Sequence, residues 1–342
     1  MAKQATALVC KENEAFSLEK VTLPEPGDKE ILVRNLRSGV SIGTEMLLVH
    51  KKINWGPFPI CLGYQAVGIV EETGSSVEGF APGDKVYHRG CHAEMRLENG
   101  TRVSPTSGAH ASHVIVDTSN KLHGAAYLPA GVSEEAASLF VTACVGFHGV
   151  NTAGVRMGEK VVVLGAGLIG LGILAAARLR SSQTIVVDRD EFRLDIARRM
   201  GAGMTVNVSS PKGEKRLGDV LGEGADVAFE ATGVPACIDQ AISYCRPRGK
   251  FVFMGNYGEA PVSFHFLMPH WKQLTAYFPS DDGYQPSREA VMNLIASGGI
   301  AWDRAITHRV AAQESPEIYS QLAQSNLENA LGIVINWEGI AP

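Results

Sequence analysis

The sequence lacks the features that mark secreted or membrane-spanning proteins. It has six cysteines: Cys10, Cys61, Cys91, Cys144, Cys237 and Cys245. They are scattered and form no paired framework, which favours a reducing compartment over a disulfide scaffold. No stretch approaches the roughly 18 apolar residues that a membrane span needs, and the N-terminal region has no apolar signal segment. We therefore expect a cytoplasmic protein that does not insert into a membrane.

Basic charge is also scarce. The net charge is −5 at pH 7, with 31 Lys and Arg against 36 Asp and Glu. A nucleic-acid-binding protein usually carries a basic stripe, and its absence excludes nucleic acid as an expected partner. What is present is the balance of a soluble globular chain, with 45% hydrophobic and 20% charged residues. The length of 342 residues favours two domains.

The N-terminal part of the chain, up to about residue 125, is rich in strand signals. Short β-branched runs separated by Gly, Pro and Asp predict strands over 31–41, 66–73, 84–90 and 111–117. Beyond Leu128 the pattern changes to an Ala-rich helical segment. Ser133 precedes two acidic residues there and is a candidate N-cap.

From residue 160 onward, strands and helices alternate. Apolar runs predict strands within 160–167, 183–188, 226–233 and 250–256, and helical patterns lie at 168–180, 191–200 and 237–245. Continuous apolar strands are typical of a parallel sheet that is buried on both faces. The alternation predicts an α/β fold with a doubly wound parallel sheet. The segments 288–298, 306–310 and 333–337 leave this rhythm, and we expect them to return to the mostly β first domain.

The strongest motif is a glycine-rich turn, Gly165-Ala166-Gly167-Leu168-Ile169-Gly170. It follows a predicted buried strand and opens a helix, which is the context of a dinucleotide-binding loop. Gly165 permits the tight turn, Gly167 lets the backbone approach a pyrophosphate, and Gly170 lets helix and strand pack closely. Leu168 and Ile169 begin the helix whose free N–H groups and dipole favour the phosphates.

An acidic residue, Asp188, follows at the end of the next predicted strand. A carboxylate at this place accepts hydrogen bonds from the adenosine ribose and repels a 2′-phosphate. The neighbouring Arg189 is the residue that would favour the phosphorylated coenzyme. With Asp188 present, the pattern predicts NAD as cofactor. The alternative, a glycine turn in a nucleotide-free domain, does not explain the complete context.

Taken in order, the motifs resemble the medium-chain dehydrogenase/reductase superfamily. They are GVSIGTE, GYQAVGIVEETG, PGDKV, GAGLIG, VVDRDEFRLDIARRMGA, DVAFEATG, GKFVFMG and ITHR, and they span essentially the whole chain. The resemblance implies a Rossmann domain at 144–275 and a discontinuous, mostly β GroES-like catalytic domain at 1–143 and 276–342. It also places Arg193, Thr232 and Gly255 among the coenzyme-binding residues.

The sequence departs from this family at the catalytic zinc. Zinc-dependent members read GxCGTD and GHE, with a third ligand on the helix before the coenzyme domain. Here Ile42, Tyr64 and Val141 occupy those positions, and Gln65 replaces the neighbouring acid. Ile and Val cannot bind a metal and neutral Tyr is a poor zinc ligand. The run of cysteines that forms the structural zinc lobe is missing too. We therefore expect no metal.

The motif SxGTE, which has no cysteine before GTE, resembles the branch of the family that contains the bacteriochlorophyllide hydroxyethyl dehydrogenases. That resemblance implies oxidation of a secondary alcohol on a bulky substrate. Without zinc, a side chain must hold the substrate oxygen and carry its proton.

Four residues are the candidates for this proton chemistry. By resemblance, Thr44 matches the hydroxyl relay position, Tyr64 occupies a ligand position, and Glu45 matches an acid that would here hold Tyr64. His50 is a candidate for the end of a proton relay. Each has a structural alternative: Thr44 as a turn cap, Tyr64 as cleft wall and His50 as a solvated helix residue.

A second group of residues has the composition of a metal site. His88, Cys91 and His92 follow the run DKVY, and His110 and His113 form an HxxH pair. On paired strands these side chains would converge with spacing similar to that of zinc ligands. The alternatives are a polar loop rich in histidine and a substrate contact by one of the histidines.

The predicted function is therefore a zinc-independent, NAD-dependent oxidoreductase that interconverts a secondary alcohol, such as a polyol, cyclitol or pathway intermediate, and its ketone. One alternative is a zinc-free NAD(P)H-dependent reductase of activated C=C bonds or quinones, although that branch carries AxxGGVG at the phosphate loop. Another is a non-catalytic NAD-binding protein. We expect a homodimer, in which the apolar segment 261–278 is a candidate for the interface.

Overall fold

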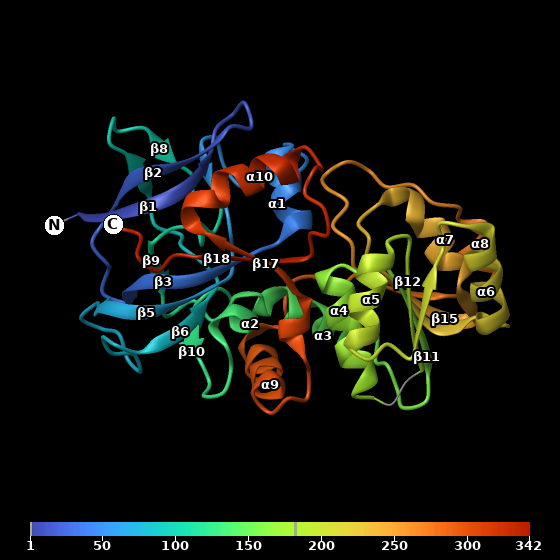
Figure 1. The fold of residues 1–342 in the computed structure, drawn as a ribbon. Coiled ribbons are helices and arrows are strands. Elements are labelled where there is room, and N and C mark those ends of the chain that lie inside the picture. The colour runs from blue at the N-terminus through green and yellow to red at the C-terminus, as the bar shows by residue number, and fades with distance from the viewer. Residues whose placement is uncertain (1, 181–182) are drawn as a thin grey trace. The chain divides into compact units, whose positions relative to one another are not determined.

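The computed structural model describes residues 2–180 and 183–342, which form two compact units. The first unit contains residues 1–140, 292–297 and 306–342, and the second contains 141–291 and 298–305. The first unit is therefore discontinuous in sequence. In Figure 1 the C-terminal elements β17 and β18, in red, lie among the blue and cyan N-terminal strands.

The first unit consists of two sheets and three short helices. Its strands are β1 (Lys3–Cys10), β2 (Phe16–Leu23), β3 (Glu30–Val40), β4 (Ile60–Cys61), β5 (Ala66–Thr73), β6 (Lys85–His88), β7 (Met95–Leu97), β8 (Arg102–Val103), β9 (His113–Asp117), β10 (Ala125–Tyr127), β17 (Ile306–Ala311) and β18 (Gly332–Asn336). Its helices are α1 (Ile42–Val49), α2 (Glu134–Ser138) and α10 (Ser315–Ala323), with a 3-10 turn at Ala312–Glu314.

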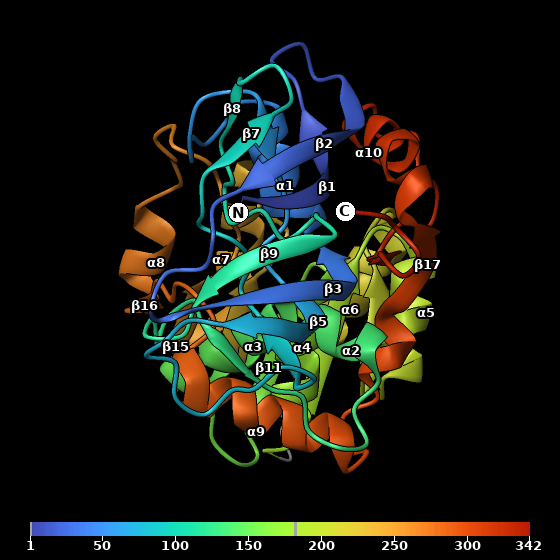
Figure 2. The same ribbon diagram turned by 90° about the vertical axis from the view of Figure 1, so that its left-hand side faces the viewer.

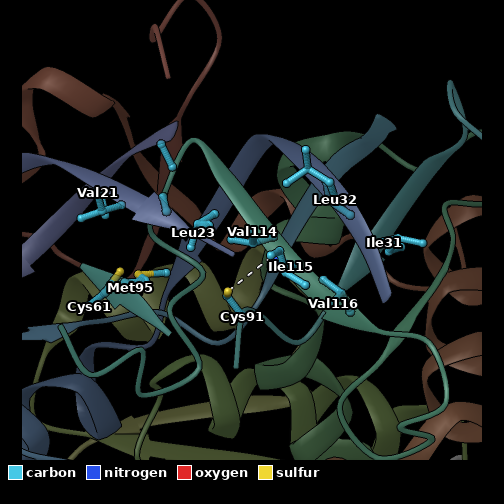
Figure 3. Packing of buried hydrophobic residues seen from close by; sticks show 14 of the residues in the cluster. Val21, Leu23, Ile31, Leu32, Cys61, Cys91, Met95, Val114, Ile115 and Val116 are labelled. Carbon is cyan, nitrogen blue, oxygen red and sulfur yellow. Dashed lines mark hydrogen bonds between the residues drawn. The ribbon is translucent and has the colours of Figure 1, made fainter. Parts of the chain in front are cut away.

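The long strand β3 organises the first unit. It pairs antiparallel with β5 along one edge and with β9 and β18 along the other, as Figure 2 shows for β9 and β5. The sheet order is β10-β6-β5-β3-β18-β17, and the second sheet runs β4-β1-β2-β7-β8. Leu32, Val114, Cys91 and Met95 belong to one of the buried clusters of this unit (Figure 3). Of the three segments expected to return to this domain, 306–310 and 333–337 lie in β17 and β18 of its sheet, whereas 288–298 is divided between the two units.

The second unit is a parallel sheet of order β13-β12-β11-β14-β15-β16. Its strands are β11 (Lys160–Leu164), β12 (Gln183–Asp188), β13 (Met204–Asn207), β14 (Ala225–Glu230), β15 (Cys245–Phe253) and β16 (Thr275–Tyr277). Its helices are α3 (Phe140–Thr152), α4 (Leu168–Arg178), α5 (Glu191–Arg199), α6 (Pro211–Leu221), α7 (Ile238–Ser243), α8 (Leu267–Trp271) and α9 (Tyr284–Ala296), with 3-10 turns at Pro235–Cys237 and Trp302–Ala305. The strand order reverses at β11 and β14, so the predicted doubly wound α/β class is confirmed.

The units are divided at places close to, but not identical with, the predicted boundaries. The first division lies at 140/141 rather than 143/144, within the start of α3. The second lies at 291/292 rather than 275/276. The reason is β16, which pairs with β15 and adds a strand to the parallel sheet, whereas α9 spans the division.

Local capping signals agree with the structure. Ser133 caps α2 by accepting a hydrogen bond from the Ala136 N–H at 3.1 Å, as predicted. Across the described parts of the chain, no helix is both long and apolar enough to cross a membrane.

Candidate active site

The glycine turn of the second unit has the conformation that a dinucleotide loop requires. Gly165 has φ of +106°, and a Cβ there would lie 2.9 Å from the Ala231 carbonyl carbon. A Cβ on Gly170 would lie 1.9 Å from the Gly165 oxygen, so only glycine lets α4 approach the turn. Gly167 differs, because a Cβ there would meet none of the described atoms within 4 Å. This open space beside the α4 N-terminus fits an approaching pyrophosphate.

Asp188 ends β12 with its carboxylate already oriented. The Ala166 N–H donates to Oδ2 at 2.7 Å, and the N–H groups of Arg189 and Asp190 donate to Oδ1 at 2.7 and 3.0 Å. The carboxylate therefore joins the glycine turn to the start of α5. Of the two predicted arginines, Arg189 is exposed, and Arg193 lies with its Nε 3.6 Å from Asp190.

A buried glutamate that the sequence reading did not select, Glu230, shapes the next two loops. At the end of β14 its carboxylate accepts the Thr232 N–H at 2.8 Å and the hydroxyls of Thr232 and Tyr257. A Cβ on Gly255 would lie 2.8 Å from Glu230 Oε2, which explains the glycine. Thr232 and Gly255 thus lie together at the carboxyl ends of β14 and β15, where coenzymes bind in such sheets. The run DVAFEATG, quoted above as a family motif, contains Glu230 but not its distant partner Tyr257.

In the first unit, three hydroxyl side chains meet at the start of α1; we call Ser41, Thr44 and Tyr64 the hydroxyl cluster. The Tyr64 hydroxyl donates to Ser41 Oγ, and the Thr44 side chain also hydrogen-bonds to Tyr64. Ser41 is the N-cap residue of α1. Two of the predicted residues therefore converge, and Ser41 joins them although the sequence reading did not select it. Its place before the predicted GTE turn was the available signal.

Tyr64 is held in an apolar and cationic environment. Only 9% of it is exposed, its ring lies 6.4 Å from that of Trp55, and the Arg89 guanidinium lies 5.5 Å from its ring centre. Burial raises the pKa of Tyr64, with the hydrogen bond between Tyr64 and Ser41 opposing that change and the nearby Glu45 charge adding to it. Tyr64 is therefore a protonated hydrogen-bond donor at neutral pH.

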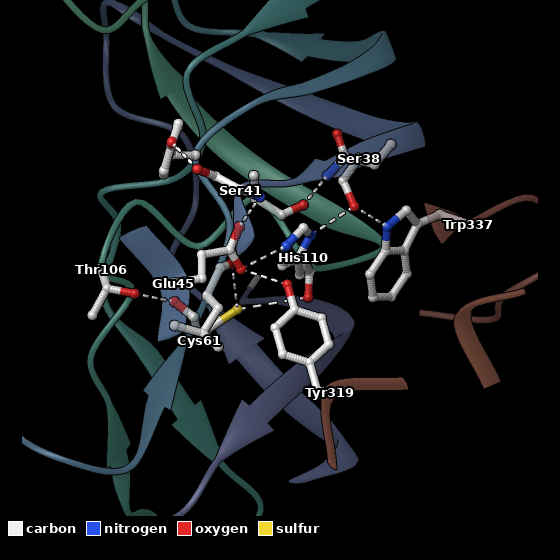
Figure 4. Close-up of polar contacts among 12 residues, drawn as sticks. Ser38, Ser41, Glu45, Cys61, Thr106, His110, Tyr319 and Trp337 are labelled. Atoms are coloured by element: carbon white, nitrogen blue, oxygen red, sulfur yellow. Dashed lines mark hydrogen bonds and ion pairs between the residues drawn. The ribbon is translucent and has the colours of Figure 1, made fainter. Parts of the chain in front are cut away.

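Glu45 is fully buried and does not play the predicted part of holding Tyr64. Its carboxylate instead accepts the Ser41 N–H at 2.7 Å, His110 Nε2 at 3.1 Å and the Tyr319 hydroxyl (Figure 4). Three donors leave it poorly placed to accept a substrate proton. The correction has a physical reason: Glu45 points into the unit, where an unpaired charge would be costly, and these groups satisfy it.

The network continues through His110. Trp337 Nε1 donates to Ser38 Oγ at 2.8 Å, and Ser38 Oγ lies 2.7 Å from His110 Nδ1. Because the indole can only donate, the Ser38 proton is available for Nδ1, which places the ring hydrogen on Nε2, toward Glu45. A Cβ on Gly63 would lie 2.7 Å from the His110 ring, so glycine is needed beside it.

His50 lies apart from the hydroxyl cluster. It is the C-cap residue at the other end of α1, its side chain is 37% exposed, and Nδ1 is 3.4 Å from a Glu14 oxygen. The structure therefore does not bring His50 to Tyr64 and Thr44, and a surface role at the helix end accounts for it.

The histidine-rich group does not converge as a metal site. Within residues 2–180 and 183–342, no three His, Cys, Asp or Glu side chains lie where they could share a metal ion. His88 is buried with Nε2 2.8 Å from Asn35 Oδ1, and its Nδ1 accepts the Gly90 N–H. Burial lowers the pKa of His88 to about 3. Cys91 is buried and accepts the Ile115 N–H, His92 stacks on His123, and His113 pairs with Glu71.

The residues at the three family ligand positions do not fit a zinc ion. Ile42 packs against the apolar cluster around Leu8 and Leu48, and Val141 is a buried residue of α3. Tyr64 uses its hydroxyl in the hydroxyl cluster. The aliphatic side chains of Ile42 and Val141 supply no donor atom for a metal ion.

Two family descriptions match the chain. "Alcohol dehydrogenase GroES-like domain" matches residues 27–126, and "Zinc-binding dehydrogenase" matches residues 169–297. These ranges contain the hydroxyl cluster in the first unit and most of the parallel sheet in the second.

Known proteins resemble the chain over most of its length. An L-threonine 3-dehydrogenase from Aliivibrio salmonicida is 30% identical over 264 residues, covering 72% of this chain and 75% of that protein. The alcohol dehydrogenase from Thermus sp. ATN1 superposes with a TM-score of 0.80 at 25% identity, covering 97% and 99% of the two chains. A zinc-binding dehydrogenase from Sinorhizobium meliloti, solved with NADP bound, has a TM-score of 0.81 at 24% identity and coverages of 98% and 99%. The glycine turn, the two units and these relatives together show that the chain belongs to the medium-chain dehydrogenase/reductase superfamily.

Proposed function

We propose that this protein is an NAD-dependent dehydrogenase that interconverts a secondary alcohol and its ketone without a catalytic zinc. The observation that carries the proposal is the buried Tyr64, which lies at a family ligand position and hydrogen-bonds to Ser41 and Thr44. Relatives named alcohol dehydrogenase and L-threonine 3-dehydrogenase support an alcohol substrate.

The hydroxyl cluster can do the proton chemistry. A bound nicotinamide coenzyme supplies the hydride acceptor for oxidation and the hydride donor for reduction. In reduction, Tyr64 donates its proton to the carbonyl oxygen as the carbon receives hydride, so the product is a neutral alcohol and Tyr64 becomes a phenolate. In oxidation, the phenolate takes the hydroxyl proton as hydride leaves the carbinol carbon. Ser41 and Thr44 orient the Tyr64 oxygen in both directions.

The raised pKa of Tyr64 sets the direction of the pH dependence. Reduction needs the protonated residue, so its rate constant kcat should hold through neutral pH and fall only above about pH 10. Oxidation needs the phenolate, and its kcat should rise with pH over the same alkaline range. Opposite slopes in the two directions are the expected signature.

The choice of NAD rests on Asp188. Its oriented carboxylate suits ribose hydroxyls and repels a 2′-phosphate. The structural relative with bound NADP makes the ratio of kcat/KM for the two coenzymes a direct test. Turnover of activated C=C bonds with NADPH alone would instead support the reductase alternative.

The deciding experiment combines metal analysis with a tyrosine variant. Chelator-treated protein should hold less than about 0.1 zinc per chain and still oxidise secondary alcohols, because the ligand positions lack donor atoms. Tyr64→Phe should lower kcat by about 10²- to 10⁴-fold, whereas Tyr127→Phe, an exposed tyrosine of the same unit, should not. One zinc per chain, or an unchanged Tyr64→Phe, would refute the proposal; coenzyme binding with no turnover of any alcohol would favour a non-catalytic protein.

We also propose a homodimer in the cytoplasm. The segments on either side of the outer edge strand β16 expose Phe264, Phe266, Leu267, Trp271 and Phe278, with exposed fractions from 43% to 74%. Such an apolar edge favours pairing with a second copy. The cysteines are free thiols, which supports a reducing compartment. Light scattering should give a dimer, and Trp271→Glu should shift it toward monomer.

A further inference from the structure

A buried cation lies against the hydroxyl cluster. The guanidinium carbon of Arg89 lies over the face of the Tyr64 ring, 5.5 Å from its centre. Each of the two residues is only 9% exposed, so water screens little of the interaction between them. An arginine side chain stays protonated in proteins. Tyr64 is therefore held beside a permanent positive charge.

The backbone that carries Arg89 is firmly held. Arg89 directly follows β6, and its N–H donates to the Gly124 oxygen at 3.3 Å. The next residue, Gly90, has φ of +101°, and a Cβ there would lie 1.8 Å from the Ser107 oxygen, so only glycine permits this approach. The guanidinium is therefore presented from a fixed strand end, and little reorganisation is needed when charge develops on Tyr64.

Several groups act on the Tyr64 hydroxyl. Burial raises the pKa of Tyr64, and the Glu45 charge adds to that rise. The hydrogen bonds with Ser41 and Thr44 and the positive charge of Arg89 oppose it. Since both hydroxyls are neutral, Arg89 is the group of this set that meets a negative charge on Tyr64 with a positive one.

The attraction between Arg89 and Tyr64 grows as the Tyr64 proton leaves. A neutral phenol ring attracts a cation over its face through its quadrupole. The phenolate carries a full negative charge, so the same guanidinium stabilises the phenolate more than it stabilises the phenol. An interaction that is stronger with the charged form assists the step in which the charge develops.

We propose that Arg89 stabilises the Tyr64 phenolate and so promotes proton transfer between Tyr64 and the substrate oxygen. The identity of the substrate as an alcohol rests on the proposed function. In oxidation, Tyr64 first loses its proton to water. The phenolate then takes the hydroxyl proton while the carbinol carbon gives its hydride to the coenzyme, and Tyr64 is neutral again. In reduction the same phenolate forms as Tyr64 gives its proton to the carbonyl oxygen. Arg89 acts through Tyr64 and is in this sense a positioning residue.

Removing the charge should change the pH dependence of the reaction. Arg89→Met should move the alkaline rise of kcat for oxidation upward by about 1 to 2 pH units, because an opposite charge at such a distance favours the phenolate by about that amount. Burial and the charges of His123 and Arg89 lower the pKa of His92, so this neighbour of Arg89 is already neutral in that range and adds no titration of its own.

The same substitution should slow both directions at about pH 8. The phenolate becomes scarcer but is a stronger base, and the two effects partly cancel. We therefore expect kcat/KM for oxidation to fall about threefold to tenfold. The overall equilibrium fixes the ratio of the two directions, so kcat/KM for reduction should fall by the same factor. The KM for the alcohol should change little, because Arg89 contacts the Tyr64 ring and acts on its charge.

The direct test does not require turnover. The near-ultraviolet absorbance of the Tyr64 phenolate is titrated as the difference between each protein and the same protein carrying Tyr64→Phe. In Arg89→Met the phenolate should form about 1 to 2 pH units higher than in the wild type. In Arg89→Lys, which keeps the charge, it should form close to the wild-type pH. If Arg89→Met does not fold, Arg89→Gln removes the same charge and takes its place.

Arg37→Met is the matched control. Arg37 is a partly buried arginine of the same unit, and its guanidinium pairs with Glu338 at 2.6 Å. The variant loses one positive charge from the first unit, as Arg89→Met does, but not the charge over the Tyr64 ring. It should keep the wild-type titration of Tyr64 and the wild-type pH profile.

The outcomes separate this inference from the proposed function. An unchanged titration of Tyr64 in Arg89→Met, or an equal change in Arg37→Met, would overturn the role of Arg89 and leave the proposed function intact. A raised titration with unchanged kcat/KM would overturn its part in proton transfer. A raised titration with no alcohol turned over by the wild type would support the stabilisation of the phenolate and overturn the proposed function. A loss of kcat/KM that Arg89→Lys restores, together with the raised titration, would support both.

Discussion

Each unit contains a fully buried glutamate, and the two differ in where their partners come from. Glu230 is held largely by the loop directly after it, through Thr232 and Gly233, with Tyr257 27 residues away. Glu45 is held by its own helix turn at Ser41 and by His110 and Tyr319, 65 and 274 residues away. The first arrangement builds a loop within a local motif, whereas the second ties α1 to the loop before β9 and to α10. A buried carboxylate can therefore serve a local turn or the closure of a discontinuous domain.

The largest effect should come from removing the long-range carboxylate. Glu45→Ala leaves His110, Tyr319 and the Ser41 N–H without their acceptor, and should cost about 3–5 kcal/mol of unfolding free energy. Glu230→Ala should cost less, about 1–3 kcal/mol of unfolding free energy, because Thr232 is exposed and Tyr257 is only half-buried, so water can replace the carboxylate. Urea unfolding of both variants measures the free energy that each one loses. Equal losses would contradict the difference between the local and the long-range glutamate.

Acid should affect the first unit through His88. Because burial lowers the pKa of His88 to about 3 in the folded protein, the unfolded chain binds an extra proton between about pH 6.5 and pH 3. This group's contribution is complete above pH 6.5 and falls by about 1.4 kcal/mol for each pH unit below it. Urea midpoints at about pH 7 and pH 5 should show the loss. In His88→Gln the slope of stability against pH should be shallower than in the wild type.

The second unit can be changed without affecting proton chemistry. Asp188→Ala removes the acceptor for the coenzyme ribose and should raise the KM for NAD by about tenfold to hundredfold, with little change in kcat. The KM for NADP should stay level or fall, since the repulsion is gone. Asp188→Ala also leaves three backbone N–H groups without their acceptor. The melting temperature of the variant is therefore measured as a control for lost stability. A parallel rise in both KM values would mean that Asp188 only supports the turn.

The smallest expected effect is at the rim of the coenzyme loops. Tyr257→Phe removes one hydrogen bond to Glu230 and should lower the free energy of unfolding by about 1 kcal/mol. It should also raise the KM for coenzyme modestly. Tyr319→Phe, the corresponding change at Glu45, should cost more because that hydroxyl is fully buried. Urea unfolding compares the free energies that the two variants lose. A larger loss in Tyr257→Phe than in Tyr319→Phe would contradict the contrast between the local and the long-range glutamate.

The α/β class, the alternation of strands and helices in the second unit and the glycine turn could be predicted from the sequence. Gly170 packs against Gly165 within the same turn, and Asp188 accepts the N–H groups of the two residues after it, so their spacing reports these contacts directly. The Ser133 cap was predictable for the same reason. The proposed absence of a catalytic zinc also rests on sequence alone, because the aliphatic Ile42 and Val141 have no donor atoms in any fold. The approach of Gly165 to the distant Ala231, by contrast, depends on the pairing of β11 with β14.

Only the tertiary structure decided what surrounds Tyr64 and Glu45. No local pattern in the sequence pairs Glu45 with Tyr319, because such contacts form only when β18 and α10 return to β3 and α1. The separation of His50 from Thr44 depends on the length of α1, and the separate partners of His88 and His113 depend on strand register. Sequence spacing determines interactions within a turn, whereas long-range burial determines which polar groups must satisfy one another.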